Sequence, residues 1–151
     1  MSKRSALLDW LVNASGPLKQ ITTGNGYNNT VSLVERGQRD IGDLNDSDYP
    51  CLFVIAPDES RKNITVNQFD AELTVQIIGG VKLASGTTGL QTLLDGLISD
   101  VTKAVETDRT QGGRVYNTMV KRIQTDHGDI DPLGACVLDV IFKYATEGTN
   151  P

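Results

Sequence analysis

The chemistry open to this sequence is limited by its few reactive side chains. The 151-residue chain contains one histidine, His127, which lies in the acidic run 126–132. A serine-type catalytic triad needs a histidine that accepts the proton of the nucleophile, and a lone histidine among acids is a poor candidate for that role. We therefore interpret His127 as a solvated loop residue, and we expect that the chain is not an enzyme.

Two acidic loops offer oxygen atoms that could bind a divalent cation. Their acids are Asp126, Asp129 and Asp131 beside His127, and Asp43, Asp46 and Asp48. Neither loop has the central glycine and distal bidentate glutamate, in the right order, that a calcium-binding loop uses. Aspartates also favour turns, so we interpret both loops as turns, with a metal site as the alternative.

Two further motifs carry weaker signals. Gly24 and Gly26 stand before Tyr27, but no clear buried strand precedes them and no helix follows, so they predict a turn and not a phosphate-binding loop. Asp58 and Glu59 are neighbours, and neighbours in a strand point to opposite faces, so they should not act as an acid and base pair. We assign no catalytic, cofactor-binding or metal-binding residue and expect no cofactor.

The two cysteines, Cys51 and Cys136, each lie inside an apolar run. Free cysteine behaves there as a small core residue, so we expect two buried thiols, with a disulfide as the alternative. A tetrahedral zinc site would need a carboxylate from a distant segment in addition to these cysteines and His127.

Hydrophobic periodicity predicts two amphipathic helices. The first covers residues 5–15, with Leu7, Leu8 and Leu11 on its apolar stripe, and Gly16 followed by Pro17 ends it. The second begins near Leu90. Its apolar positions are Leu90, Leu93, Leu94, Leu97, Ile98, Val101 and Val105, and its predicted outer face consists of Gln91, Asp95, Asp100 and Lys103.

Strands are predicted at residues 31–35, 51–56, 69–77, 114–125 and 136–144. We expect a turn at residues 57–60, and Gly79 and Gly80 should stop or bulge the third strand. The weak pattern of residues 114–125 indicates an edge strand, which could pair across subunits. The fold class is therefore α+β: one domain over residues 1–151, with a mostly antiparallel mixed sheet of about four to five strands and two main helices packed on one face.

Charge and hydropathy exclude several classes of partner. The formal net charge is -5, and the 14 lysines and arginines are scattered in short pairs, so no clustered basic face for duplex binding is visible. The apolar stretch near the N-terminus is interrupted by Asp9, which makes it too short for a signal sequence or a membrane span. We expect a protein made in the cytoplasm, with no membrane partner.

Residues 21–56 resemble the tail terminator proteins of long-tailed bacteriophages, the group of the minor tail protein U. The resemblance rests on the glycine-rich turn, a strand ending in Val34-Glu35-Arg36-Gly37, the acidic loop over residues 43–48 and the strand from Tyr49 to Val54. In the order of elements, it extends over most of the chain.

The resemblance implies a structural virion protein without a catalytic site. Such a protein forms a homo-oligomeric ring, expected to be a hexamer, at the head-proximal end of the tail. Its partners are copies of itself, the tail tube protein and a head-tail connector protein, with DNA passing through the ring but no sequence-specific nucleic-acid binding. Two alternatives stay open: a neck, adaptor or other tail-completion subunit, and a small metal-dependent enzyme or ligand-binding module built on Asp126, His127 and Asp129.

Overall fold

The computed structural model describes residues 2–83, 89–126 and 132–147. The elements are α1 (Lys3–Val12), β1 (Leu33–Arg36), β2 (Cys51–Thr65), β3 (Gln68–Lys82), α2 (Leu90–Thr107), β4 (Asn117–Thr125) and β5 (Leu133–Glu147), with short 3-10 turns at Thr23–Asn25, Ile41–Asp43 and Asp46–Asp48. The strands form one five-stranded sheet in the order β1-β2-β3-β5-β4. Only β1 and β2 run parallel, so the predicted α+β class with a mostly antiparallel mixed sheet is confirmed.

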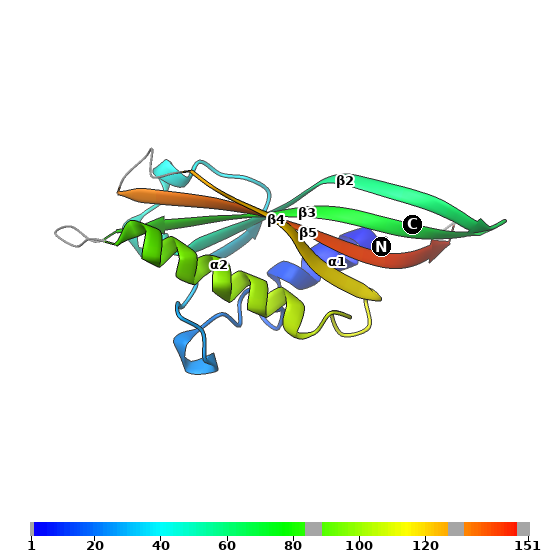
Figure 1. Cartoon of the computed structure of the whole chain (residues 1–151), viewed down its shortest axis with the longest axis horizontal. Coiled ribbons are helices and arrows are strands. Elements are labelled where there is room, and N and C mark those ends of the chain that lie inside the picture. The colour runs from blue at the N-terminus through cyan, green and yellow to red at the C-terminus, as the bar shows by residue number, and fades with distance from the viewer. Residues whose placement is uncertain (1, 84–88, 127–131, 148–151) are drawn as a thin grey trace.

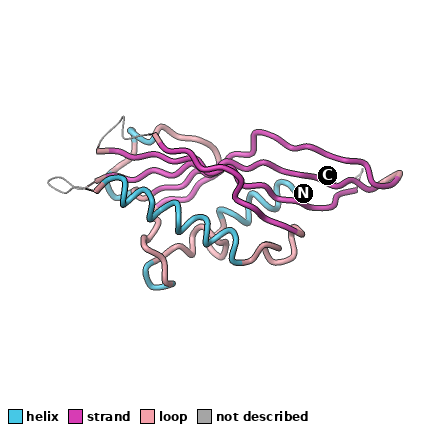
Figure 2. Tube along the Cα trace, viewed as in Figure 1, coloured by secondary structure: helices cyan, strands magenta, loops and turns pink. Residues whose placement is uncertain are grey.

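Both helices lie on the same side of the sheet (Figure 1). α1 contacts β1 and β2, whereas α2 contacts β3, β4 and β5. The hairpin of β2 and β3 projects beyond the helices (Figure 2). The molecule therefore has two layers, and part of the sheet extends past the helical layer.

The main core lies between the helices and the sheet. Alternate residues of β5, from Cys136 to Tyr144, are buried on this face, as the period-2 pattern predicts. α1 contributes Leu7, Leu8 and Leu11, and α2 contributes Leu94, Leu97, Val101, Ala104 and Val105. Burial of each large apolar side chain contributes roughly 1.5–3 kcal/mol, so this layer is the main source of stability.

A smaller core occupies the opposite face of the sheet. Leu44, from the loop between β1 and β2, packs there with Cys51, Phe53 and Ile78. Phe53 is fully buried although no helix covers this face. Residues 37–50, which we call the aspartate loop, thus serve as the cover for one end of the sheet's second face.

The predicted turn at residues 57–60 is wrong, because β2 continues through them to Thr65. A bulge between Ile55 and Asp58 absorbs Pro57, and the chain reverses only after Thr65. Pro57 is tolerated because β1 ends opposite Val54. Beyond that residue β2 has no neighbouring strand on its β1 side, so Pro57 interrupts no hydrogen bonds there.

The prediction that Gly79 and Gly80 stop or bulge the strand is also wrong. Both lie within β3 and keep regular register with β2 and β5. A Cβ atom at Gly79 would lie 2.8 Å from Cys136 Sγ and 3.0 Å from Leu97 Cδ2. Glycine is therefore required here for close packing of a helix and a strand, and not for a break in the strand.

The other predicted elements differ from the structure mainly at their ends. α1 begins earlier and ends at Val12, with the Ser2 side chain accepting a hydrogen bond from the Ser5 N–H as its N-cap. β4 begins at Asn117 and is the outer strand, so the predicted edge position is confirmed.

Replacing Leu97 by alanine should lower the free energy of unfolding by about 2–5 kcal/mol, because its fully buried side chain fills the space over Gly79. Leu93→Ala, on the half-buried side of the same helix, should cost clearly less. Urea unfolding monitored by circular dichroism measures both. Equal losses in the two variants would contradict the packing described above.

Candidate interaction surfaces

The aspartate loop uses most of its carboxylates to hold its own shape. Asp40 Oδ1 accepts a hydrogen bond from the Gly42 N–H at 2.9 Å, and Asp48 Oδ2 accepts one from the Asn45 N–H at 3.1 Å. Asp46 forms an ion pair with Lys82 of β3. Asp40 and Asp48 therefore cap turns. Within the described residues, no three His, Cys, Asp or Glu side chains are placed to hold a metal ion.

The second acidic loop can be assessed only in part. His127, Asp129 and Asp131 lie outside the described residues. Asp126 directly follows β4, and its backbone N–H donates to the Ala135 carbonyl at 3.1 Å. The alternative of a metal site built on these residues stays a prediction.

Asp58 and Glu59 point to opposite faces of β2, as predicted. Asp58 is exposed opposite Thr74, whereas Glu59 lies opposite Leu73 on the helical side. The Tyr144 hydroxyl donates a hydrogen bond to Glu59, and burial together with this bond raises the pKa of Tyr144. Glu59 is therefore a structural partner of β5 and α1, with Arg4 also nearby at 3.9 Å.

The glycine-rich segment forms a turn, and Asp100 anchors it. We predicted Asp100 on the outer face of α2, but it is only 2% exposed, so that prediction is wrong. Its carboxylate accepts hydrogen bonds from the backbone N–H groups of Asn28 and Asn29 at 2.8 and 2.9 Å, and from Asn29 Nδ2 at 3.0 Å. The periodicity of α2 could not reveal this role, because the partner loop is more than 70 residues away in sequence.

Lys103 of α2 also fastens this turn. Its ammonium group donates to the Gly26 carbonyl at 3.3 Å and lies 4.8 Å from the centre of the Tyr27 ring. Gly26 adopts a left-handed conformation with φ 89°, which explains glycine at that position. The glycine-rich turn is thus held against α2.

Both cysteines are free and buried, as predicted. They lie on opposite faces of the sheet: Cys51 packs in the smaller core and Cys136 in the main core. Burial raises the pKa of the Cys51 thiol to about 11 and that of Cys136 to about 12. Neither group is a thiolate nucleophile at neutral pH.

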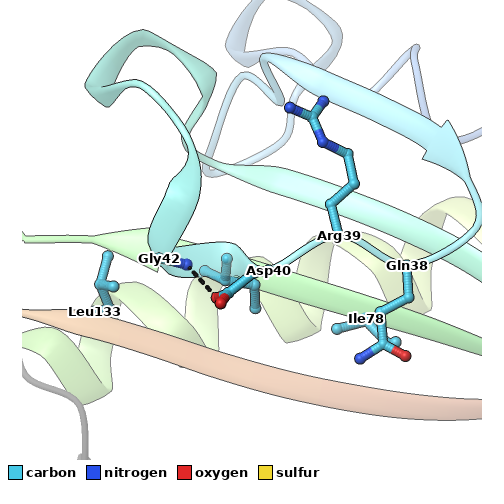
Figure 3. Close-up of a pocket in the computed structure, with 7 residues that line it drawn as sticks. Gln38, Arg39, Asp40, Gly42, Ile78 and Leu133 are labelled. Atoms are coloured by element: carbon cyan, nitrogen blue, oxygen red, sulfur yellow. Dashed lines mark hydrogen bonds between the residues drawn. The ribbon is translucent and has the colours of Figure 1, made fainter.

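A cleft of about 630 Å³ opens between the aspartate loop and the sheet. Ile41 and Ile78 line it together with Leu133 at the start of β5, and Arg39 and Asp40 stand at its rim (Figure 3). Arg39 is paired with Glu35 at 3.3 Å. Among the described residues that line it, the cleft combines apolar walls with one carboxylate, Asp40, and one cation, Arg39.

Large apolar side chains are exposed at two places in the described structure. Ile64 and Val66 are 59% and 99% exposed at the tip of the β2–β3 hairpin. Met119 and Ile123 of β4 are 43% and 45% exposed at the edge of the sheet. Sequence analysis missed their exposure, although the weak alternation of β4 already indicated a strand without a clear inner face.

No protein-family model matches the chain, and no curated protein matches it by sequence. Among the helices that the structure describes, none is long and apolar enough to cross a membrane.

Asp100→Ala should lower the free energy of unfolding by about 1–3 kcal/mol, because two backbone N–H groups of the glycine-rich turn lose their acceptor. Asp95→Ala is the matched control, since Asp95 is exposed on the same helix and accepts a hydrogen bond from the Gln91 side chain. Hydrogen exchange at Asn28 and Asn29 should accelerate in the first variant alone. Unchanged exchange there would refute the anchoring role.

Stability should fall as the pH is raised from about 9 towards 11, because unfolded chains lose thiol protons that folded chains retain. Folding raises the pKa of each thiol. The stabilisation that each thiol contributes is therefore complete below about pH 9, and it is lost as the pH rises through the pKa of the folded state. Urea unfolding at several pH values measures this decline. A Cys51→Ala and Cys136→Ala double variant should show a shallower decline, and an identical profile would contradict burial as the cause.

Proposed function

We propose that this chain is a structural subunit that assembles with copies of itself into a ring and caps the tail tube of a long-tailed bacteriophage. In this role the ring ends tube polymerisation and offers its other face to the head connector. The work is done by shape and contact, without bond-making chemistry.

The observation that carries the proposal is the exposure of large apolar side chains at β4 and at the hairpin tip. Exposed apolar groups are common on protein surfaces as single residues, but groups that gather on one element mark sites of association. Ile64 and Val66 share one tip, whereas Met119 and Ile123 share one edge strand but point to opposite faces of the sheet. The hairpin tip and the outer strand therefore both expose apolar groups to partners.

The resemblance of residues 21–56 to tail terminators supports a phage tail as the assembly. Three of the segments that carry it are adjacent in space, because β1 pairs in parallel with β2 and the aspartate loop joins them. The glycine-rich turn is held by α2 on the other face of the sheet. Loops on a rigid scaffold are common recognition elements, which suits a protein that meets several partners.

A ring follows from a contact between two unlike surfaces whose rotation closes. Such a ring has two different faces, because every subunit points the same way. One face can match the end of a tail tube while the other cannot accept a further tube ring. This geometry is sufficient to stop polymerisation.

The full-length protein should form a closed oligomer, expected to be a hexamer, which multi-angle light scattering and negative-stain electron microscopy would show. Tail tube protein polymerised in its presence should yield shorter tubes with this chain at one end. The glycine-turn variant Asp100→Ala gives no information here, since it alters the fold. A monomer at high concentration that leaves tube length unchanged would refute the proposal, and density between portal and head-completion proteins would assign it to the neck instead.

A further inference from the structure

We infer that β4 of one subunit binds the aspartate loop and its cleft on the next subunit, so that copies of this chain associate head to tail through two unlike surfaces. The inference rests on the self-assembly proposed above and identifies the two surfaces that make the contact. It commits to a second copy of this chain as the occupant of the cleft.

One surface is an edge strand and the other lies on a face of the sheet. β4 is the outer strand at one edge. The aspartate loop follows β1, the outer strand at the other edge, and lies on the side of the sheet away from the helices (Figure 1), where its cleft extends over Ile78 to Leu133 of β5, the neighbour of β4. A subunit can therefore offer β4 to one neighbour while its cleft receives the β4 of another.

Their charges are opposite. β4 contains Lys121 and Arg122 and no acidic residue, although the chain as a whole is acidic. Neither cation forms an ion pair within the described residues, and Asp139, the cross-strand neighbour of Arg122, stays beyond ion-pair distance. Two unmatched positive charges thus lie on β4. Arg122 shares the face of Met119, whereas Ile123, opposite Leu138, points to the helical face.

The aspartate loop has four aspartates and one arginine. The arginine, Arg39, is already neutralised by Glu35, and Lys82 neutralises Asp46. Asp40, Asp43 and Asp48 remain without a cationic partner in the described part of the chain. The loop therefore carries negative charge beside a cleft with apolar walls.

Apolar groups complement one another in the same arrangement. The cleft is walled by Ile41, Ile78 and Leu133, and Met119 is an exposed apolar side chain on the same face of β4 as Arg122. Contact between two copies of the same surface is disfavoured, because β4 against β4 opposes cations and loop against loop opposes aspartates. Only the unlike pairing combines opposite charges with apolar contact.

Contact through side chains is also favoured over direct strand pairing. A bulge between Val120 and Arg122 interrupts the ladder of β4, and the bulge at Pro57 interrupts the free edge of β2. Bulges, proline and charged side chains are the features that keep sheet edges from pairing with one another. The edges are therefore poor templates for an added strand, whereas the side chains of β4 remain accessible.

A charge exchange between two variants tests the contact in the full-length protein. One variant carries Lys121→Glu and Arg122→Glu, and the other carries Asp40→Asn and Asp43→Lys, in which asparagine keeps the capping oxygen for Gly42. Each variant alone should associate at least tenfold more weakly than the wild type in sedimentation equilibrium. An equimolar mixture should regain association, because an alternating ring of even number restores opposite charges at every contact.

The control is Lys19→Glu, which reverses the charge of an exposed residue outside β4, the aspartate loop and the hairpin tip and should leave association unchanged. Circular dichroism and urea unfolding verify that each variant is folded, and the milder Arg122→Gln and Asp43→Asn changes replace any variant that is not. A wild type that associates while both variants associate equally well overturns the inference and leaves the proposed ring intact. A mixture that gains nothing over its components also overturns it, and a wild type that stays monomeric refutes the proposed function as well.

Discussion

Close contact between α2 and the centre of the sheet is the interaction on which the rest of the molecule depends. Leu97 can approach β3 because residue 79 is glycine, and Cys136 of β5 fills the adjacent space. This contact fixes α2 over the sheet, and α2 in turn holds the glycine-rich turn through Asp100 and Lys103. A methyl group at residue 79 would thus disturb the helix, the strand and a distant loop together.

Sequence patterns predicted the class of fold and most of the elements, because local periodicity records which face of an element is buried. β5 and α2 are the clearest examples, since each alternates or repeats without interruption over its length. The errors occurred where a long-range contact overrides a local signal. Pro57 and Asp58 are typical turn residues but lie within β2, Pro57 in a bulge and Asp58 opposite Thr74. Asp100 has the sequence pattern of an exposed residue but accepts backbone hydrogen bonds.

The interaction surfaces were harder to predict than the fold for a similar reason. The exposure of Met119 and Ile123 depends on which strand occupies the edge of the sheet and on how far α2 covers that strand. The sequence of residues 117–125 determines neither of these two features. The sequence shows the four aspartates of the aspartate loop. It does not show which of them caps a turn, which forms an ion pair and which has no cationic partner in the described part of the chain. Asp46 differs from Asp43 in forming an ion pair, because the Lys82 side chain reaches Asp46.

The placement of the two cysteines gives each layer of the molecule its own internal reporter. Cys51 is covered by the aspartate loop, and Cys136 lies beneath the helices. A thiol reagent reaches each sulfur atom only when the layer above it opens, so separate labelling rates would measure the opening free energy of the loop layer and of the helical layer within one native chain. If the loop is the more easily displaced cover, the small core can rearrange while the main core stays closed.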